Sequence, residues 1–242
     1  MSLNNMLPFI STAIMLLFTI SVFQRYAVRR NPAFLYWGIG LAMFGAGSFA
    51  EAFLVLKWNS AIFVVWYLFG AALNAAWLGH GTLALLVQKR WVTVLTVLLV
   101  IGSVIAGIMM LQLTLNSGAY ETGVAISNTY REIMPEGAKV RLTTPFFNIY
   151  GLIMLVGGAL YSAFLFWRKR VLPNRVIGNV LIAAGALSIG FASSLARLGY
   201  GEYLYIGELV AAVMMYSGFL MAAAPSKVPA KATAPEKAPS PA

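Results

Sequence analysis

Three ionisable residues lie within long apolar stretches of this chain and are its main candidates for chemistry: Glu51, Arg197 and Glu208. At about 1.5 Å of helix rise per residue, each lies roughly 6 to 10 Å from one end of its stretch. A charged side chain in hydrocarbon costs on the order of several kcal/mol, so such groups face a bundle interior and pair. We expect Arg197 to pair with Glu208, Glu51 or both. The cluster either fixes helix register or forms part of a ligand or ion site, and both interpretations stay open.

Two further polar residues lie deeper in the third apolar stretch. Asn74 is near its middle, and His80 is nearer its far end between Gly79 and Gly81. Small residues on a spanning helix are typical of close packing. This context favours a neutral, hydrogen-bonded His80 over a proton carrier or a cofactor ligand, although that alternative stays open.

The residue types that are missing exclude most site chemistry. The chain has no cysteine, no aspartate and one histidine, which excludes disulfides, thiol catalysis, cysteine-bound metals and multi-histidine metal sites. The strong acid–base groups left are Glu51, Glu208 and His80, and His80 is too far along its helix to meet the glutamates directly. We therefore predict no enzymatic activity, no metal site and no cofactor.

The elements that position these residues are membrane spans. The chain is 60% hydrophobic and only 10% charged, whereas soluble domains carry about a quarter charged residues. A spanning helix needs about 20 apolar residues. Composition and length predict an all-α, polytopic membrane protein with a seven-helix domain over residues 1–224, and with these spans: 7–23, 33–56, 61–87, 91–113, 145–167, 176–196 and 203–224. Aromatic pairs near the predicted span ends fit interfacial belts: Tyr36 with Trp37, Trp66 with Tyr67, and Tyr203 with Tyr205.

The distribution of basic residues predicts the orientation. Of the 17 basic residues, 12 fall on one side of the predicted spans: Arg25, Arg29, Arg30, Lys89, Arg90, Arg168, Lys169, Arg170, Arg175, Lys227, Lys231 and Lys237. The positive-inside bias then predicts a multi-pass protein of the bacterial inner (plasma) membrane, with the N-terminus outside and the C-terminus in the cytoplasm. The net charge of +10 does not indicate nucleic-acid binding, because these residues cluster at helix ends where they contact lipid headgroups.

Two segments lie outside the predicted spans. Residues 116–144 form an external loop of a length that is usually functional or disordered. Residues 225–242 are mainly Ala, Pro and Lys, which predicts a disordered cytoplasmic tail.

The chain also contains matches at an offset of 140 residues. Five residues of the second span match five of the sixth: Gly38, Leu41, Gly45, Ala46 and Ser48 with Gly178, Leu181, Gly185, Ala186 and Ser188. Spans one to three and five to seven would then be two parallel three-helix repeats joined by the fourth span, as in some transporters. Because Gly and Ala are common in all spanning helices, the repeat and a chance match both stay open.

The first three spans carry a resemblance to a known family. Its residues are Arg29-Arg30-Asn31-Pro32, Ser48-Phe49-Ala50-Glu51-Ala52-Phe53 and Trp66-Tyr67, which cover about half of the span region. They resemble the seven-helix sensor region at the N-terminus of bacterial membrane histidine kinases. No kinase domain follows Ala224, so the resemblance implies a freestanding sensing or scaffolding module.

From these residues we expect a non-enzymatic membrane module that acts as a sensor-like or accessory subunit. It would bind membrane lipids and another integral membrane protein, or form a homo-oligomer, and a small external ligand is compatible with the intramembrane charges. The alternative is a small-solute or ion transporter whose pathway uses Glu51, Arg197, Glu208 and Asn74, since intramembrane charges often mark such routes.

Overall fold

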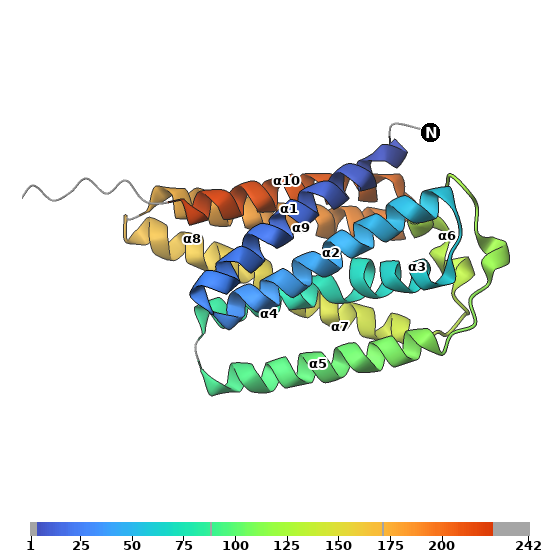
Figure 1. Ribbon diagram of the computed structural model, residues 1–242, viewed down its shortest axis with the longest axis horizontal. Coiled ribbons are helices and arrows are strands. Elements are labelled where there is room, and N and C mark those ends of the chain that lie inside the picture. The colour runs from blue at the N-terminus through green and yellow to red at the C-terminus, as the bar shows by residue number, and fades with distance from the viewer. Residues whose placement is uncertain (1–3, 88, 171, 225–242) are drawn as a thin grey trace, which may run out of the picture.

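The computed structural model describes residues 4–87, 89–170 and 172–224, apart from the side chains of Arg197 and Glu202. Within these residues the chain folds into helices and connecting turns, with no strand. Seven helical stretches are long and apolar enough to cross a membrane, which confirms the predicted all-α polytopic fold (Figure 1). The predicted tail, residues 225–242, lies outside the described residues, so its disorder stays a prediction.

Five spans are each one α-helix: α1 (Leu7–Arg29), α2 (Pro32–Leu56), α5 (Arg90–Leu111), α9 (Pro173–Arg197) and α10 (Glu202–Ala223). The third and fifth spans each contain a π-helical segment: α3 (Ser60–Val65), η2 (Trp66–Leu73) and α4 (Asn74–Leu86), then α7 (Val140–Leu152), η4 (Ile153–Gly157) and α8 (Gly158–Arg168). The short elements are η1 (Asn4–Met6), η3 (Ser117–Ala119) and α6 (Ile126–Ile133).

The turn between the first two spans shows how local sequence sets the helix ends. Arg30 adopts a left-handed conformation at φ 51°, which ends α1. The Asn31 side chain then accepts a hydrogen bond from the Ala33 amide at 2.9 Å and caps α2. Pro32 occupies the first helical position, where its missing N–H costs no helix hydrogen bond.

Six of the seven spans pack in a closed ring in the order one, two, three, five, six, seven, and the seventh returns to the first. The fourth span, α5, lies along one side of this ring, apart from most of it (Figure 1). Its buried residues are few: Val92, Leu99, Ala106 and Met110. Two three-helix units, spans one to three and spans five to seven, would form such a ring if a two-fold axis related them. The internal repeat itself stays a prediction.

Glycine pairs hold neighbouring spans of the ring in backbone contact. A Cβ atom built on Gly79 would lie 2.6 Å from the carbonyl oxygen of Gly151, so only glycine fits there. Gly47 of α2 and Gly70 of η2 approach each other in the same way. The small residues beside His80 therefore serve close helix packing, as the sequence predicted.

The fifth span begins earlier than its proline suggested. The structure starts α7 at Val140, and Pro145 lies inside the helix. As its sixth residue, Pro145 breaks only the ladder bond that would reach the carbonyl of Arg141. The Thr143 hydroxyl donates to the Val140 carbonyl at 2.7 Å and supports this first turn.

Residues 116–139, which we call the cap, are folded against the ends of the spans rather than forming a loose loop. The Tyr120 hydroxyl donates to the Leu54 carbonyl at 2.6 Å, and the Gly123 amide donates to the Val55 carbonyl at 2.9 Å. Both carbonyls belong to the last turn of α2, where helical partners are lacking. We call this end of the bundle the capped end and the opposite end, with Arg30 and Lys89, the basic end.

The prediction of interfacial belts is wrong for four aromatic residues, which are buried inside the bundle: Trp37, Trp66, Tyr67 and Tyr205. The polar atoms of Trp37 and Tyr67 have partners there. The Trp37 indole donates to the Thr82 hydroxyl at 3.0 Å, and the hydroxyls of Tyr67 and Thr144 are 3.0 Å apart. Aromatic residues with a satisfied polar atom are as suited to a core as to an interface.

Candidate functional site

Glu51 and Glu208 lie together inside the ring near the capped end. Glu51 is on α2 and is 0% exposed, and Glu208 is on α10 and is 6% exposed. Their carboxyl groups face each other. The structure therefore brings together two of the three ionisable residues that the sequence singled out.

The side chains around this carboxyl pair hydrogen-bond to Glu208 but leave the oxygens of Glu51 without a well-formed hydrogen bond in the described structure. The Ser48 hydroxyl donates to Oε2 of Glu208 at 3.1 Å. The Trp66 side chain lies against the Glu51 carboxyl, yet neither oxygen of Glu51 completes a hydrogen bond of good geometry within the described part of the chain. Buried polar groups are nearly always hydrogen-bonded, so Glu51 is an exception that needs a cause.

A third buried polar group, the Ser11 hydroxyl of α1, also lacks a described partner. Its position along the bundle follows from its neighbours. Met15 lies against Gly45 of α2, and Leu7 packs on the cluster that contains Val55. Ser11 is halfway between Met15 and Leu7, and it is therefore level with the carboxyl pair.

The pair can bind one positive charge. Two carboxylates in contact repel each other strongly when both are ionised in a low-dielectric interior. Buried charges persist in proteins when they are paired or coordinated. A proton or a small cation between the two carboxyl groups would remove the repulsion and give the Glu51 oxygens a partner.

Arg197 is the last residue of α9, and its side chain lies outside the described part of the structure. Its backbone can be placed because α9 and α10 pack together, with Gly207 against Ala192. From there α9 continues towards the capped end, which puts Arg197 level with the first turn of α10. Its pairing with Glu51 or Glu208 stays a prediction.

Asn74 stabilises the π-helical segment of the third span. Its amide donates to the Gly70 carbonyl at 2.9 Å, and the Asn148 amide of α7 donates to the Ala71 carbonyl at 3.0 Å. A π-helical turn disturbs the regular ladder and leaves carbonyls to be satisfied by other groups. The contact of Asn74 is thus local, and the structure does not bring Asn74 to the carboxyl pair.

His80 is fully buried near the basic end, and both of its ring nitrogens have partners. Nδ1 lies 2.8 Å from the Tyr150 hydroxyl of α7, and Nε2 lies 2.7 Å from the Thr96 hydroxyl of α5. The Thr96 hydroxyl also approaches the Val92 carbonyl at 3.0 Å. If Thr96 donates to that carbonyl, Nε2–H donates to Thr96 and Tyr150 donates to Nδ1, which describes a neutral histidine.

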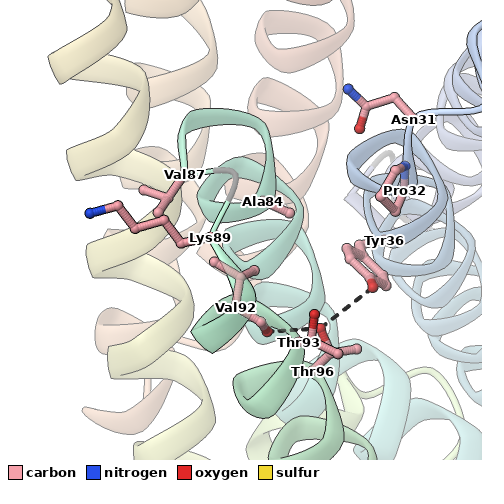
Figure 2. A pocket seen from close by; sticks show the side chains of 9 residues that line it. All are labelled: Asn31, Pro32, Tyr36, Ala84, Val87, Lys89, Val92, Thr93 and Thr96. Carbon is pink, nitrogen blue, oxygen red and sulfur yellow. Dashed lines mark hydrogen bonds between the residues drawn. The ribbon is translucent and has the colours of Figure 1, made fainter.

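A cavity of about 420 Å³ lies beside this network at the basic end (Figure 2). Tyr36 and Thr96 belong to both, since the Thr96 hydroxyl lies 3.4 Å from that of Tyr36. The lining comes from the start of α2, the end of α4 and the start of α5: Asn31, Pro32, Tyr36, Ala84, Val87, Lys89, Val92, Thr93 and Thr96.

Sequence reasoning missed most partners of these residues. Ser48 could have been found, because it lies three residues before Glu51 on the same helix face. Trp66, Tyr150 and Thr96 come from other spans, and no local pattern marks them. Among the described residues no cluster of three or more His, Cys, Asp or Glu side chains could hold a metal ion.

No family model, curated protein or solved structure matches this chain. Its function therefore has to be inferred from its own side chains.

Proposed function

We propose that this chain is a non-enzymatic, sensor-like membrane module that binds one cation, a proton or an alkali-metal ion, between Glu51 and Glu208. The observation that carries the proposal is the Glu51 carboxyl, which is completely buried, faces a second carboxyl and receives no well-formed hydrogen bond on either oxygen from the described side chains. Intramembrane carboxyl groups in such surroundings usually serve proton or ion binding.

The proposed orientation places this site on the external side of a bacterial inner membrane. The 12 basic residues on one side of the spans are the basis for that orientation, with the basic end in the cytoplasm. The carboxyl pair is near the opposite, capped end. The cation would therefore come from outside the cell.

Occupancy of the pair would be transmitted through helix packing. Glu208 belongs to α10, which packs on α9 through the backbone contact of Gly218 with Gly178. We expect α9 and α10 to move as one unit when loss of the cation makes the carboxyl groups repel. The shift relative to α2 would change the surface offered to a partner membrane protein or to a second copy of the chain, in keeping with the resemblance to kinase sensor regions.

Thermal unfolding of the purified protein in detergent tests cation binding. We expect the melting temperature of the wild type to fall as protons are removed at low salt, and to recover if Na⁺ or K⁺ replaces the proton. Glu51→Gln should flatten this dependence, since a single carboxylate has no like charge to repel it. Glu121→Gln, a change of an exposed cap residue, is the matched control. An unaltered dependence in the double variant Glu51→Gln/Glu208→Gln would disprove the proposal.

Transport is the second candidate, and the π-helical segments favour it. η2 of the third span packs on α7, and η4 of the fifth span packs on α4, so both irregular segments lie at the contact between the same two spans. π-helical turns are frequent at functional sites. Uptake of ²²Na⁺ or protons by liposomes that contain only this protein, abolished by Glu51→Gln, would favour transport over sensing.

A further inference from the structure

The cavity at the basic end has the dimensions of a ligand site. Its volume of about 420 Å³ falls within the range of roughly 300–1,000 Å³ that is usual for small-molecule pockets. It lies where the first turn of α2 and the first two turns of α5 meet the end of α4 (Figure 2). This position is remote from the carboxyl pair, so the inference does not depend on the proposed cation site.

Several polar groups that line the cavity can donate a hydrogen bond to a ligand. The Asn31 side-chain oxygen already caps α2, which leaves its amide NH₂ for a ligand. Thr93 is exposed on α5, and the Tyr36 hydroxyl points towards Thr96 across the space between α2 and α5 (Figure 2). Hydroxyl and amide donors at several corners of one cavity suit a group with several acceptor oxygens.

Positive charge is present at the edge of the cavity but not inside it. Lys89 lines its edge, and Figure 2 shows the ammonium group directed away from Tyr36 and Thr96. Arg30 and Arg90 are neighbours of lining residues in the sequence. Internal donors with cations at the edge fit an anion of low charge, such as a phosphodiester, and basic pockets between spanning helices bind the headgroups of anionic lipids.

The side of the cavity formed by α5 adjoins lipid. Three of the four buried residues of α5 recur at intervals of seven, at Val92, Leu99 and Ala106, and most of its other large apolar residues are exposed. The cavity opens beside the first turns of this lipid-facing helix, at the level of the basic residues and hence of the headgroups. Pro32 and Val87 add apolar surface for the glycerol and the first carbons of a chain.

We propose that this cavity binds the phosphodiester group of an anionic phospholipid, with donors from Asn31, Tyr36 and Thr93 and with Lys89 at its edge. Binding there would act on the third span as well. Tyr36 contacts the Thr96 hydroxyl, and Thr96 contacts His80 of α4. A phosphate oxygen that accepts from Tyr36 therefore touches the network that holds His80.

Lipid titration of the delipidated protein tests the proposal. Phosphatidylglycerol and phosphatidylcholine are added separately in detergent, and bound lipid is counted by native mass spectrometry. We expect phosphatidylglycerol to bind with at least about tenfold higher affinity, and Thr93→Val and Tyr36→Phe each to reduce that preference roughly tenfold, as loss of a hydrogen bond to a charged group would. Lys89→Gln should weaken binding at low salt, whereas Lys57→Gln, at the capped end, should not.

Equal binding of the two lipids, or an unchanged preference in the Thr93→Val/Tyr36→Phe double variant, would overturn the proposal. Glycerol 3-phosphate is the probe for a soluble source of the same chemistry. If it binds as tightly as phosphatidylglycerol and displaces it, the cavity serves a soluble phosphate compound and the lipid assignment is wrong. Because Thr93 is exposed, Thr93→Val should not disturb folding, and it keeps the test valid if Tyr36→Phe fails to fold.

Discussion

The carboxyl groups of Glu51 and Glu208 meet inside the helix ring although α2 and α10 are not neighbours around it. α1 packs against both helices, and the Ser48 hydroxyl of α2 donates directly to Oε2 of Glu208 on α10 at 3.1 Å. We expect the separation of the two carboxyl groups to depend on the charge they hold, because two carboxylates repel each other in a low-dielectric interior.

Glu51→Gln should stabilise the protein against unfolding at alkaline pH by about 1–3 kcal/mol, since it removes one of two like charges and its amide can donate to Glu208. The sign follows from the repulsion, which grows as protons leave the pair. At acidic pH the gain should shrink towards zero, because a proton already relieves the wild type. Melting curves at pH 5 and pH 9 check this. A loss of stability at both pH values would show that Glu51 is needed as a carboxylate.

Arg197 supplies a test of the predicted ion pair. If its guanidinium neutralises a carboxylate of the site, Arg197→Met should destabilise the protein by roughly 3–5 kcal/mol, because it leaves a buried charge unpaired. Combining it with Glu208→Gln should recover much of that loss. Additive losses in this double-mutant cycle, and in the cycle with Glu51→Gln, would mean that Arg197 touches neither glutamate.

The His80 network should be sensitive to each hydroxyl that holds it. Tyr150→Phe leaves Nδ1 without a partner in a buried position, and the expected cost in unfolding free energy is about 1–3 kcal/mol. Tyr161→Phe is the matched control, because Tyr161 lies 55% exposed on α8. Chemical denaturation in mixed micelles can compare the two. If both changes lowered the free energy of unfolding equally, the loss in Tyr150→Phe would not be due to the His80 hydrogen bond.

The contact of Gly79 with Gly151 predicts a large effect from a single methyl group. A Cβ on Gly151 would collide with backbone atoms of Ala75 and Ala76, so Gly151→Ala should separate α4 from α7 and cost at least about 1–3 kcal/mol. Gly107→Ala on α5 is the control. Nothing lies within 4 Å of a Cβ atom there, and the change should leave stability equal or slightly higher. Melting temperatures in detergent measure both.

The proposed orientation can be read by cysteine labelling, because the natural chain has no cysteine. Ser117→Cys, in the cap, should react with a membrane-impermeant maleimide added to intact cells. Lys169→Cys, at the basic end, should react only after the membrane is opened. The reverse labelling pattern would mean that the protein has the opposite orientation, with the carboxyl pair on the cytoplasmic side.

The sequence predicted the spans well because a bilayer demands one property, about 20 apolar residues, that is local. The sequence-based predictions failed where contacts between spans determine a helix end or the burial of a residue. Pro145 was expected to open a helix that in fact starts at Val140, and Trp66 was expected at the interface but packs in the core. The cap is ordered because Tyr120 satisfies a carbonyl of α2, and no pattern within residues 116–144 reports that partner.

The candidate site was predictable only in part, and for the same reason. The cost of burying charge pointed to Glu51 and Glu208 from the sequence alone. That they face each other depends on how α1, α2 and α10 pack, which no single helix encodes. The glycine neighbours of His80 favoured a buried packing residue, and the structure shows its ring buried with both nitrogens bonded. Its partners Tyr150 and Thr96 lie on other spans, so no local pattern marks them.

The helix that contributes least to the ring determines whether the site can exist. α5 crosses the membrane once between the third and fifth spans, and this crossing returns the chain to the capped end before α7 begins. Without it, an odd number of crossings would become even, and the last three spans would enter from the basic end. Glu208 would then lie in the opposite leaflet from Glu51. The parity set by one peripheral helix thus places both carboxyl groups at the same depth.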